Sequence, residues 1–113
     1  MVKISVKKAV EEIEIGEHVY LFKLSDAHLN RVSSESKEMQ KKLEKAKSTE
    51  KNVEIAKNTL DVFLDQKGAG HEIYETCEKS SYVLANVMKE LADFINAKKD
   101  ELKQIKAAEY TEE

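Results

Sequence analysis

The apolar residues of this chain change their spacing at Ser25, and that change limits the folds open to it. Before Ser25, apolar residues alternate with Glu over residues 12–15, and residues 19–24, which are rich in β-branched and aromatic side chains, follow a short loop that contains Gly16. This pattern around a glycine-containing loop predicts a β-hairpin. After Ser25, apolar residues recur at intervals of three, four or seven, which is the spacing of one face of an α-helix.

The predicted hairpin has one polar face and one apolar face. Glu12 and Glu14 are expected to point to solvent, and the opposite face carries Ile13, Ile15, Tyr20, Phe22 and Leu24. The large apolar residues occupy even positions up to Val10 and odd positions at Ile13 and Ile15. One unbroken strand would therefore turn its own apolar residues to opposite faces. We therefore predict a break or a bulge within residues 7–10. A lone hairpin is marginal in water, so a helix or a neighbouring subunit should pack against it.

The middle of the chain, residues 25–67, is predicted to be a charged helical region with a thin apolar seam. Ser25 or Asp26 is a suitable N-cap at its start. Ser48 either begins a second helix or lies within one long helix, and the pattern leaves both possibilities open. Because the seam is too thin for a helix buried on two sides, we expect the protein to complete its burial by self-association or by binding another chain.

The clearest break in the sequence is Gly68-Ala69-Gly70, and Gly68 suits a helix C-cap there. Residues 71–107 are predicted to form a C-terminal helical region, and the polar residues 108–113 are expected to fray. The absence of Pro and the presence of only three Gly argue against turn-rich all-β folds. The sequence thus predicts a single α+β domain, residues 1–113, that is predominantly helical: a hairpin region in residues 1–24 is followed by three or four helices.

Charge and hydropathy exclude two classes of partner. The net charge is −3, and Glu residues interrupt the Lys-rich residues 37–57, whereas nucleic-acid binding needs a one-sided basic surface. The longest apolar runs are far shorter than the ~20 residues that cross a bilayer. A single Cys, Cys77, gives no intramolecular disulfide and fits a reducing cytoplasm. We therefore expect neither nucleic acid nor a membrane as partner.

No combination of reactive residues predicts catalysis. The three His and the one Cys lack the close spacing of zinc ligands, and Cys77 is better explained as a buried, inert residue of a helix contact. Gly68-Ala69-Gly70 follows a predicted helix and lacks the strand and the longer glycine pattern of a phosphate loop. The sequence therefore predicts no catalytic, cofactor-binding or metal-binding residues, no cofactor and no enzymatic activity.

Two segments carry a resemblance to a known family. The hairpin has the form Ile-x-Ile-Gly-x-x-x-Tyr-x-Phe-x-Leu-x-Asp over residues 13–26, and residues 63–70 read Phe-Leu-Asp-Gln-Lys-Gly-Ala-Gly before the last helical region. In these features and in its overall layout the chain resembles the tail assembly chaperones of long-tailed bacteriophages and prophages of Gram-positive bacteria.

This resemblance implies a non-enzymatic protein that coats the tape measure protein, a long helical chain, and keeps it soluble until the tail tube polymerises around it. It also implies a location in the bacterial host cytoplasm and absence from the mature virion. The physics is compatible, because a small domain with surplus apolar helix surface can cover the apolar face of a client helix. Many weakly bound copies along one client would act together through avidity.

The residues expected to build the core, and to contact a sister subunit or the client where they are partly exposed, are Tyr20, Phe22, Leu60, Phe63, Leu84, Leu91 and Phe94. The expected partners are the tape measure protein and further copies of the chain in a homo-oligomer. Two other functions fit the same sequence. One is a small helical adaptor or regulatory protein, and the other is a structural head–tail component of a phage or mobile element.

Overall fold

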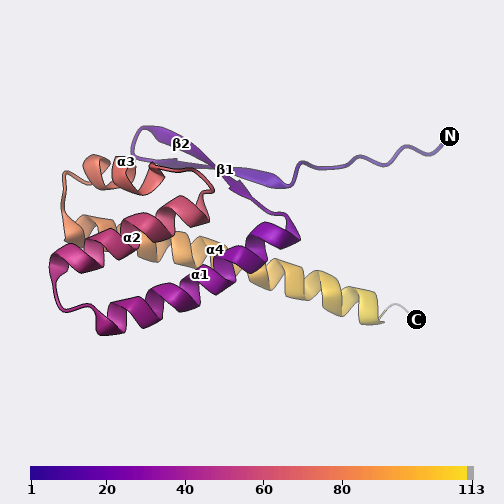
Figure 1. Ribbon diagram of the computed structural model, residues 1–113. Helices are drawn as coiled ribbons and strands as arrows, with labels where there is room; N and C mark the ends of the chain where they lie inside the picture. Colours follow the sequence, from indigo (N-terminus) through magenta and orange to yellow (C-terminus); the bar gives the residue numbers. More distant parts are fainter. Residues whose placement is uncertain (112–113) are drawn as a thin grey trace.

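The computed structural model describes residues 1–111, with the side chains of residues 1–103. It contains a two-stranded antiparallel hairpin followed by four helices, as the sequence predicts (Figure 1). The elements in chain order are β1 Val10–Ile15, β2 His18–Lys23, α1 Asp26–Lys45, α2 Thr49–Phe63, α3 Ala69–Thr76 and α4 Ser81–Thr111. The predicted fold class, a predominantly helical α+β fold, is confirmed.

The hairpin is closed by a two-residue loop between Ile15 and His18, which pair with each other. Gly16 takes the first loop position with a φ of 65°, a conformation that glycine adopts without the steric penalty of a Cβ. The burial pattern confirms the predicted faces, because Tyr20 and Phe22 are buried while Glu12 and Glu14 are exposed. Strand β1 begins at residue 10, and the chain bends at Ala9 just before it, within the residues 7–10 where a break or a bulge was predicted.

The charged middle region forms two helices rather than one. Helix α1 starts after Ser25, whose Oγ accepts a hydrogen bond from the backbone N–H of His28 at 3.3 Å. It ends before Ala46, which is extended, and α2 starts after Ser48, whose Oγ accepts a hydrogen bond from the N–H of Lys51 at 3.2 Å. The two serine caps therefore set both helix starts, since each satisfies a backbone donor left free by the first turn.

The turn between α2 and α3 differs from the sequence-based expectation for Gly68. Helix α2 ends at Phe63, with Leu64 as its C-cap, and Gly68 is the N-cap residue of α3 with a left-handed φ of 89°. The prediction of Gly68 as a C-cap was therefore wrong, because the chain leaves α2 before the glycine-containing break begins. At the other end of the molecule, α4 continues to Thr111, so residues 108–111 of the tail expected to fray are helical, and residues 112–113 lie outside the described residues.

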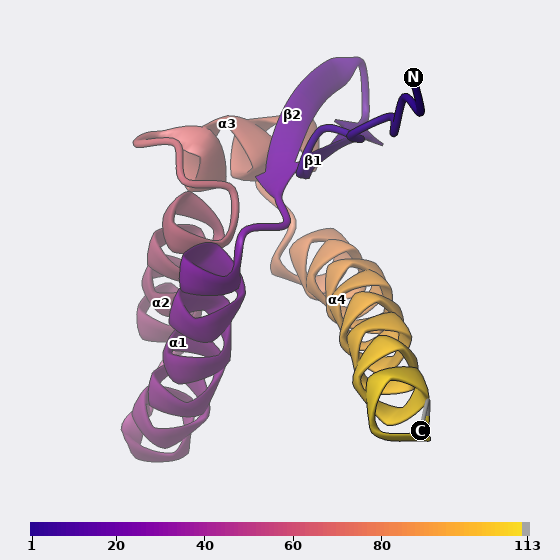
Figure 2. The same ribbon diagram turned by 90° about the vertical axis from the view of Figure 1, so that its right-hand side faces the viewer.

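The helices fall into two groups beneath the hairpin and α3. Figure 2 shows α1 and α2 side by side on one side of the molecule and α4 on the other. Helix α2 packs against α1 and α3, and it also contacts α4. The Cα radius of gyration is 16.6 Å, larger than the roughly 13 Å of a compact chain of about 100 residues. None of the helices in the described part of the chain has the length and apolar character needed to cross a membrane.

Candidate functional site: an apolar groove between α1 and α4

An apolar groove runs between α1 and α4. Figure 2 shows the two helix groups that carry its walls on opposite sides of the molecule. The groove consists of two adjoining hollows of about 240 Å³ and about 190 Å³ that share Met39 of α1 and Met88 of α4. We call this feature the α1–α4 groove and define it by the residues that line the two hollows: Ser36, Met39, Gln40, Leu43, Asn52, Val53, Ala56, Phe63, Ser81, Leu84, Ala85, Met88, Ala92, Ile95, Asn96 and Lys99.

The groove combines a rigid floor with adaptable walls. Val53 and Phe63 of α2 are buried, as is Leu84 at the root of the α4 wall. Met39 and Met88 are half-buried on opposite walls and line both hollows, and Met88 also packs against the core. Methionine has an unbranched, polarisable side chain that adjusts to ligands of different shape. The local geometry therefore favours an apolar ligand whose side chains can settle between two flexible ones.

The electrostatics of the groove are unlike those of the rest of the surface. Charged residues make up 36% of the chain, yet Lys99 is the one charged residue among the described residues that line the groove. The remaining polar groups are hydroxyls and amides, which can bond to a ligand's backbone or side chains without a fixed charge. An apolar channel with a single charged lining residue, in a highly charged protein, is typical of a surface that another apolar surface covers.

The seven residues predicted to contact partners are mostly core residues. Tyr20, Phe22, Leu60, Phe63, Leu84 and Leu91 are buried, and Phe94 is half-buried. Two of them, Phe63 and Leu84, also line the groove, and two, Leu91 and Phe94, line a separate cavity between β1 and α4. Tyr20, Phe22 and Leu60 line neither feature, and they hold the hairpin and α2 in place. Whether any of the seven contacts a partner stays a prediction.

Met39, Leu43, Val53 and Ala56 belong to the thin apolar seam of residues 25–67, which the sequence did not single out as a binding surface. Met88 belongs to the predicted C-terminal helical region and was not singled out either. The available signal was the seam itself, since it carries medium-sized apolar residues where a fully buried helix would carry larger ones. What the pattern could not show is that α1 and α4 stand apart, because that spacing depends on the packing of α2 and α3 between them.

The segment of residues 61–70 joins four elements and thereby sets the spacing of the groove walls. The Asp61 carboxylate accepts hydrogen bonds from the backbone N–H groups of Gly68 at 3.2 Å and Gly70 at 2.7 Å, which caps the start of α3. A Cβ at Gly70 would lie 2.0 Å from the backbone oxygen of Lys57, so the absence of a side chain lets α3 approach the backbone of α2. This close contact fixes α3, and with it the start of α4.

Asp65, in the same segment, ties the hairpin to both helices of the first group. Its carboxylate pairs with Lys23 of β2 and, at 3.1 Å, with Arg31 of α1. The hydrogen bond from Lys23 is the main reason that the pKa of Asp65 lies below its usual value, and Arg31 lowers that pKa further. Both ion pairs of Asp65 are exposed to solvent, so they orient the segment more than they stabilise it.

Two buried polar side chains complete this junction. His28 is buried, and its Nε2 donates a hydrogen bond to the backbone oxygen of Phe63 at 2.8 Å while its ring meets the edge of Phe22. Tyr20 donates a hydrogen bond from its hydroxyl to the Glu72 carboxylate on α3. Burial, together with this bond, raises the pKa of the Tyr20 phenol. His28 and Tyr20 both form their hydrogen bonds within the fold, so both are explained as structural residues.

The reactive groups of the chain are dispersed. Cys77 is buried in the core, and burial raises the pKa of its thiol, which disfavours the nucleophilic thiolate. His71 is exposed and lies near Lys57 and Glu75. Within the described residues, no group of three or more His, Cys, Asp or Glu side chains is placed to hold a metal ion.

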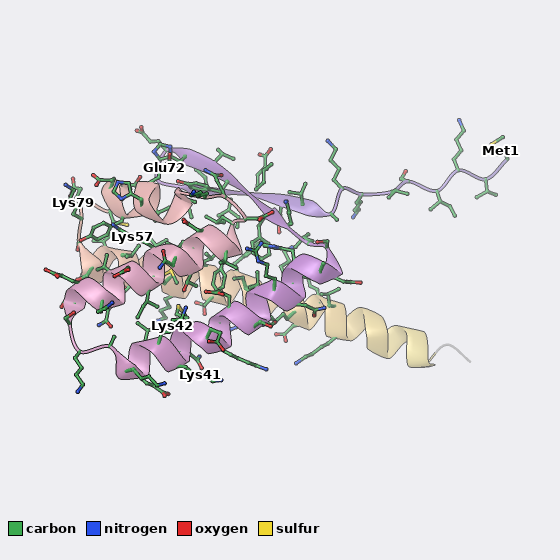
Figure 3. The ribbon with its side chains drawn as sticks, in the orientation of Figure 1. Met1, Lys41, Lys42, Lys57, Glu72 and Lys79 are labelled. Atoms are coloured by element: carbon green, nitrogen blue, oxygen red, sulfur yellow. The ribbon has the colours of Figure 1, made fainter. Side chains whose placement is uncertain are left out.

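A basic hollow of about 580 Å³ lies at the turn between α1 and α2. Lys42, Lys45, Lys47 and Lys51 line it together with one acidic residue, Glu54. Figure 3 shows Lys42 on the side of the molecule that carries this turn, far from the hairpin. Glu residues therefore cancel the Lys charge of residues 37–57 less completely at this turn than along the helices.

Comparison of the chain with known protein families, with curated proteins and with solved structures finds no match. The geometry of the groove is therefore the basis for assigning a function.

Proposed function

We propose that this protein is a non-enzymatic phage tail assembly chaperone that holds helical segments of the tape measure protein in the α1–α4 groove. The observation that carries the proposal is the groove itself, an apolar channel with one charged lining residue between two separated helix groups. The sequence resemblance of the hairpin and of residues 63–70 supplies the identity of the client. We further propose that the protein acts in the host cytoplasm and is absent from the finished virion.

The groove suits an amphipathic helix. A helix bound in a groove presents anchors at positions i, i+3, i+4 and i+7, and these would lie along the row of apolar residues from Leu43 to Ile95. The client's polar face would remain in solvent, beside the charged outer faces of α1 and α4. Binding in this way covers the part of the client that would otherwise aggregate.

Modest affinity per site is a requirement of this function. The groove is shallow, and its two methionines are already half-buried, so each bound helix removes a limited apolar area from water. Many copies on one long client multiply this weak binding through effective concentration. Polymerising tail tube subunits can then displace the copies one at a time, which a tightly closed complex would prevent.

The experiment co-expresses the chain with the tape measure protein and compares groove variants with a matched control. Leu43 is 37% exposed and Ala85 is exposed, so Leu43→Asp and Ala85→Glu place a charge in the groove without opening the core. Val83, on α4 and 41% exposed, does not line the groove, so Val83→Asp adds a charge at similar exposure elsewhere.

We expect the groove variants to weaken co-purification of the tape measure protein at least about tenfold, and Val83→Asp to leave it unchanged. The proposal is wrong if the tape measure protein is equally soluble without this chain, or if all three variants bind it alike. Mass spectrometry of purified virions gives an independent check. Stoichiometric presence of the chain there would assign it to the structural head–tail class instead.

A further inference from the structure

A second apolar cavity, of about 250 Å³, lies at the edge of β1 that β2 leaves unpaired. The described residues that line it come from β1, the hairpin turn and α4: Ile13, Glu14, Ile15, Gly16, Val87, Glu90, Leu91 and Phe94. Its apolar part lies between the strand and the helix, and both of its charged lining residues are acidic. We call it the edge cavity. An unpaired strand edge above an apolar hollow is a template for one further strand.

The N-terminal arm, residues 1–8, has the pattern of such a strand. It is extended and runs away from the body of the protein, with Met1 at its far end (Figures 1 and 3). Val2, Ile4 and Val6 are 86%, 85% and 91% exposed, and they alternate with Lys3, Ser5 and Lys7. Because strand side chains alternate between faces, the arm as a strand has one aliphatic face and one basic face.

We propose that the arm of one copy of this chain adds as a strand to the free β1 edge of a second copy, and that two copies exchange arms in this way. The aliphatic face of the arm then enters the edge cavity beside Ile13 and Ile15. The basic face lies beside Glu12 and Glu14, which point to solvent from the other face of β1. Both faces of the arm thus meet a matching face of the strand.

Charge and length agree with this pairing. Residues 1–8 contain three Lys and no acidic residue, whereas three of the six residues of β1 are Glu. Eight extended residues span about 26 Å, enough to cover a six-residue strand of about 20 Å. Reciprocal exchange buries both arms and both strand edges through a two-fold symmetric contact, which closes the assembly at two copies.

The arm reaches a second copy more readily than its own β1 edge. Folding back would require a tight turn immediately before β1, but residues 1–15 contain no Gly, Pro, Asn or Asp, the residues that favour tight turns. The backbone oxygen of Ala9 also accepts a hydrogen bond from the N–H of Leu24 at 2.8 Å. This bond continues the ladder of the hairpin by one residue, and the arm leaves the body of the protein from there (Figure 1).

Charge exchange between two variants tests the proposal. The arm variant carries Lys3→Glu and Lys7→Glu, and the strand variant carries Glu12→Lys and Glu14→Lys. All four positions are exposed, so both variants should keep the circular dichroism spectrum of the parent. Sedimentation or light scattering over a range of concentrations gives the mass of each variant alone, of their equal mixture, and of the chain with all four substitutions.

We expect the parent chain to dimerise, each double variant to dimerise at least about tenfold more weakly, and both the mixture and the fourfold variant to recover the dimer. Recovery in the mixture requires contact between copies, because an arm folded onto its own strand would leave the mixture unchanged. The proposal is overturned if the parent stays monomeric up to about 1 mM, or if the mixture behaves as its separate components do.

A second substitution tests the aliphatic face. Ile4→Asp would place a carboxylate in the edge cavity beside Glu90, and it should weaken the dimer at least about tenfold. Ile4→Val keeps an aliphatic side chain there and should retain the dimer. Equal dimerisation of the two variants would show that the arm does not enter the cavity.

Discussion

The contact between Gly70 and the backbone of Lys57 gives the sharpest prediction about stability. A Cβ at Gly70 would lie 2.0 Å from the Lys57 oxygen and 2.6 Å from its carbonyl carbon and Cα. Ordinary contacts of a Cβ begin near 3.4 Å, and the obstructing atoms are helix backbone, which cannot rotate away as a side chain can. Gly70→Ala must therefore force α2 and α3 apart along the contact that positions α4.

Two opposing effects set the magnitude. In an unobstructed helix, replacing Gly by Ala stabilises by about 1 kcal/mol, because alanine loses less backbone entropy on folding. Overpacking of a tight contact costs up to about 3 kcal/mol. The net result expected for Gly70→Ala is a loss of about 2 kcal/mol in the free energy of unfolding, opposite in sign to the effect of the same substitution in an open helix.

Urea denaturation followed by circular dichroism at the helix band measures this change. Gly68→Ala is the matched control, because nothing lies within 4 Å of a Cβ there and the cost arises from its φ of 89° alone. A left-handed residue other than glycine costs about 1 kcal/mol. Gly70→Ala should thus be the more destabilising of the two. A Gly70→Ala variant as stable as the parent would refute the proposed role of the contact.

Three further predictions concern ionisable groups. The partners of Asp65 lower its pKa, so Asp65 adds stability above its unfolded pKa of about 3.9; the stability difference between the parent and Asp65→Asn should therefore vanish as the pH falls through the lowered value. Tyr20 has a raised pKa, so its contribution is present below about pH 10 and is lost above it; Tyr20→Phe should cost about 1.5 kcal/mol at pH 7 and flatten the decline of stability in alkali. Cys77 is buried, so its reaction with a thiol reagent should be slow in the native protein and should accelerate in denaturant in step with the loss of helix signal.

Local features of the fold were predictable because short-range physics determines them. Alternation before Gly16 located the hairpin, and Ser25 or Asp26 was predicted as the N-cap of α1, which Ser25 provides through its side-chain oxygen. Ser48 was recognised as a possible helix start, but whether a helix breaks there depends on α2 turning back to pack on α1. Gly68 was assigned to the wrong helix end, since left-handed glycine suits either end and only the position of Leu64 decides between them.

The candidate site was less predictable than the fold, for a physical reason. Large aromatic and aliphatic residues such as Phe22 and Leu60 stand out in the sequence, but the fold buries them. The groove consists of residues with ordinary spacing, and it exists because two helix walls are held apart. That separation depends on distant contacts, above all Gly70 against α2 and Asp61 at the start of α3, whose partners no local pattern specifies.

The two walls of the groove belong to helices whose main contacts lie elsewhere, since α1 rests on α2 while α4 contacts α2 and α3. Between α3 and α4 the chain passes through Glu78 and Lys79, both with a φ of 57°. A few degrees of backbone rotation between α3 and α4 would tilt α4 and change the width of the α1–α4 groove. The groove could then accept helices with narrow or broad apolar faces. It would select a helix by the width of its apolar face and not by a particular sequence.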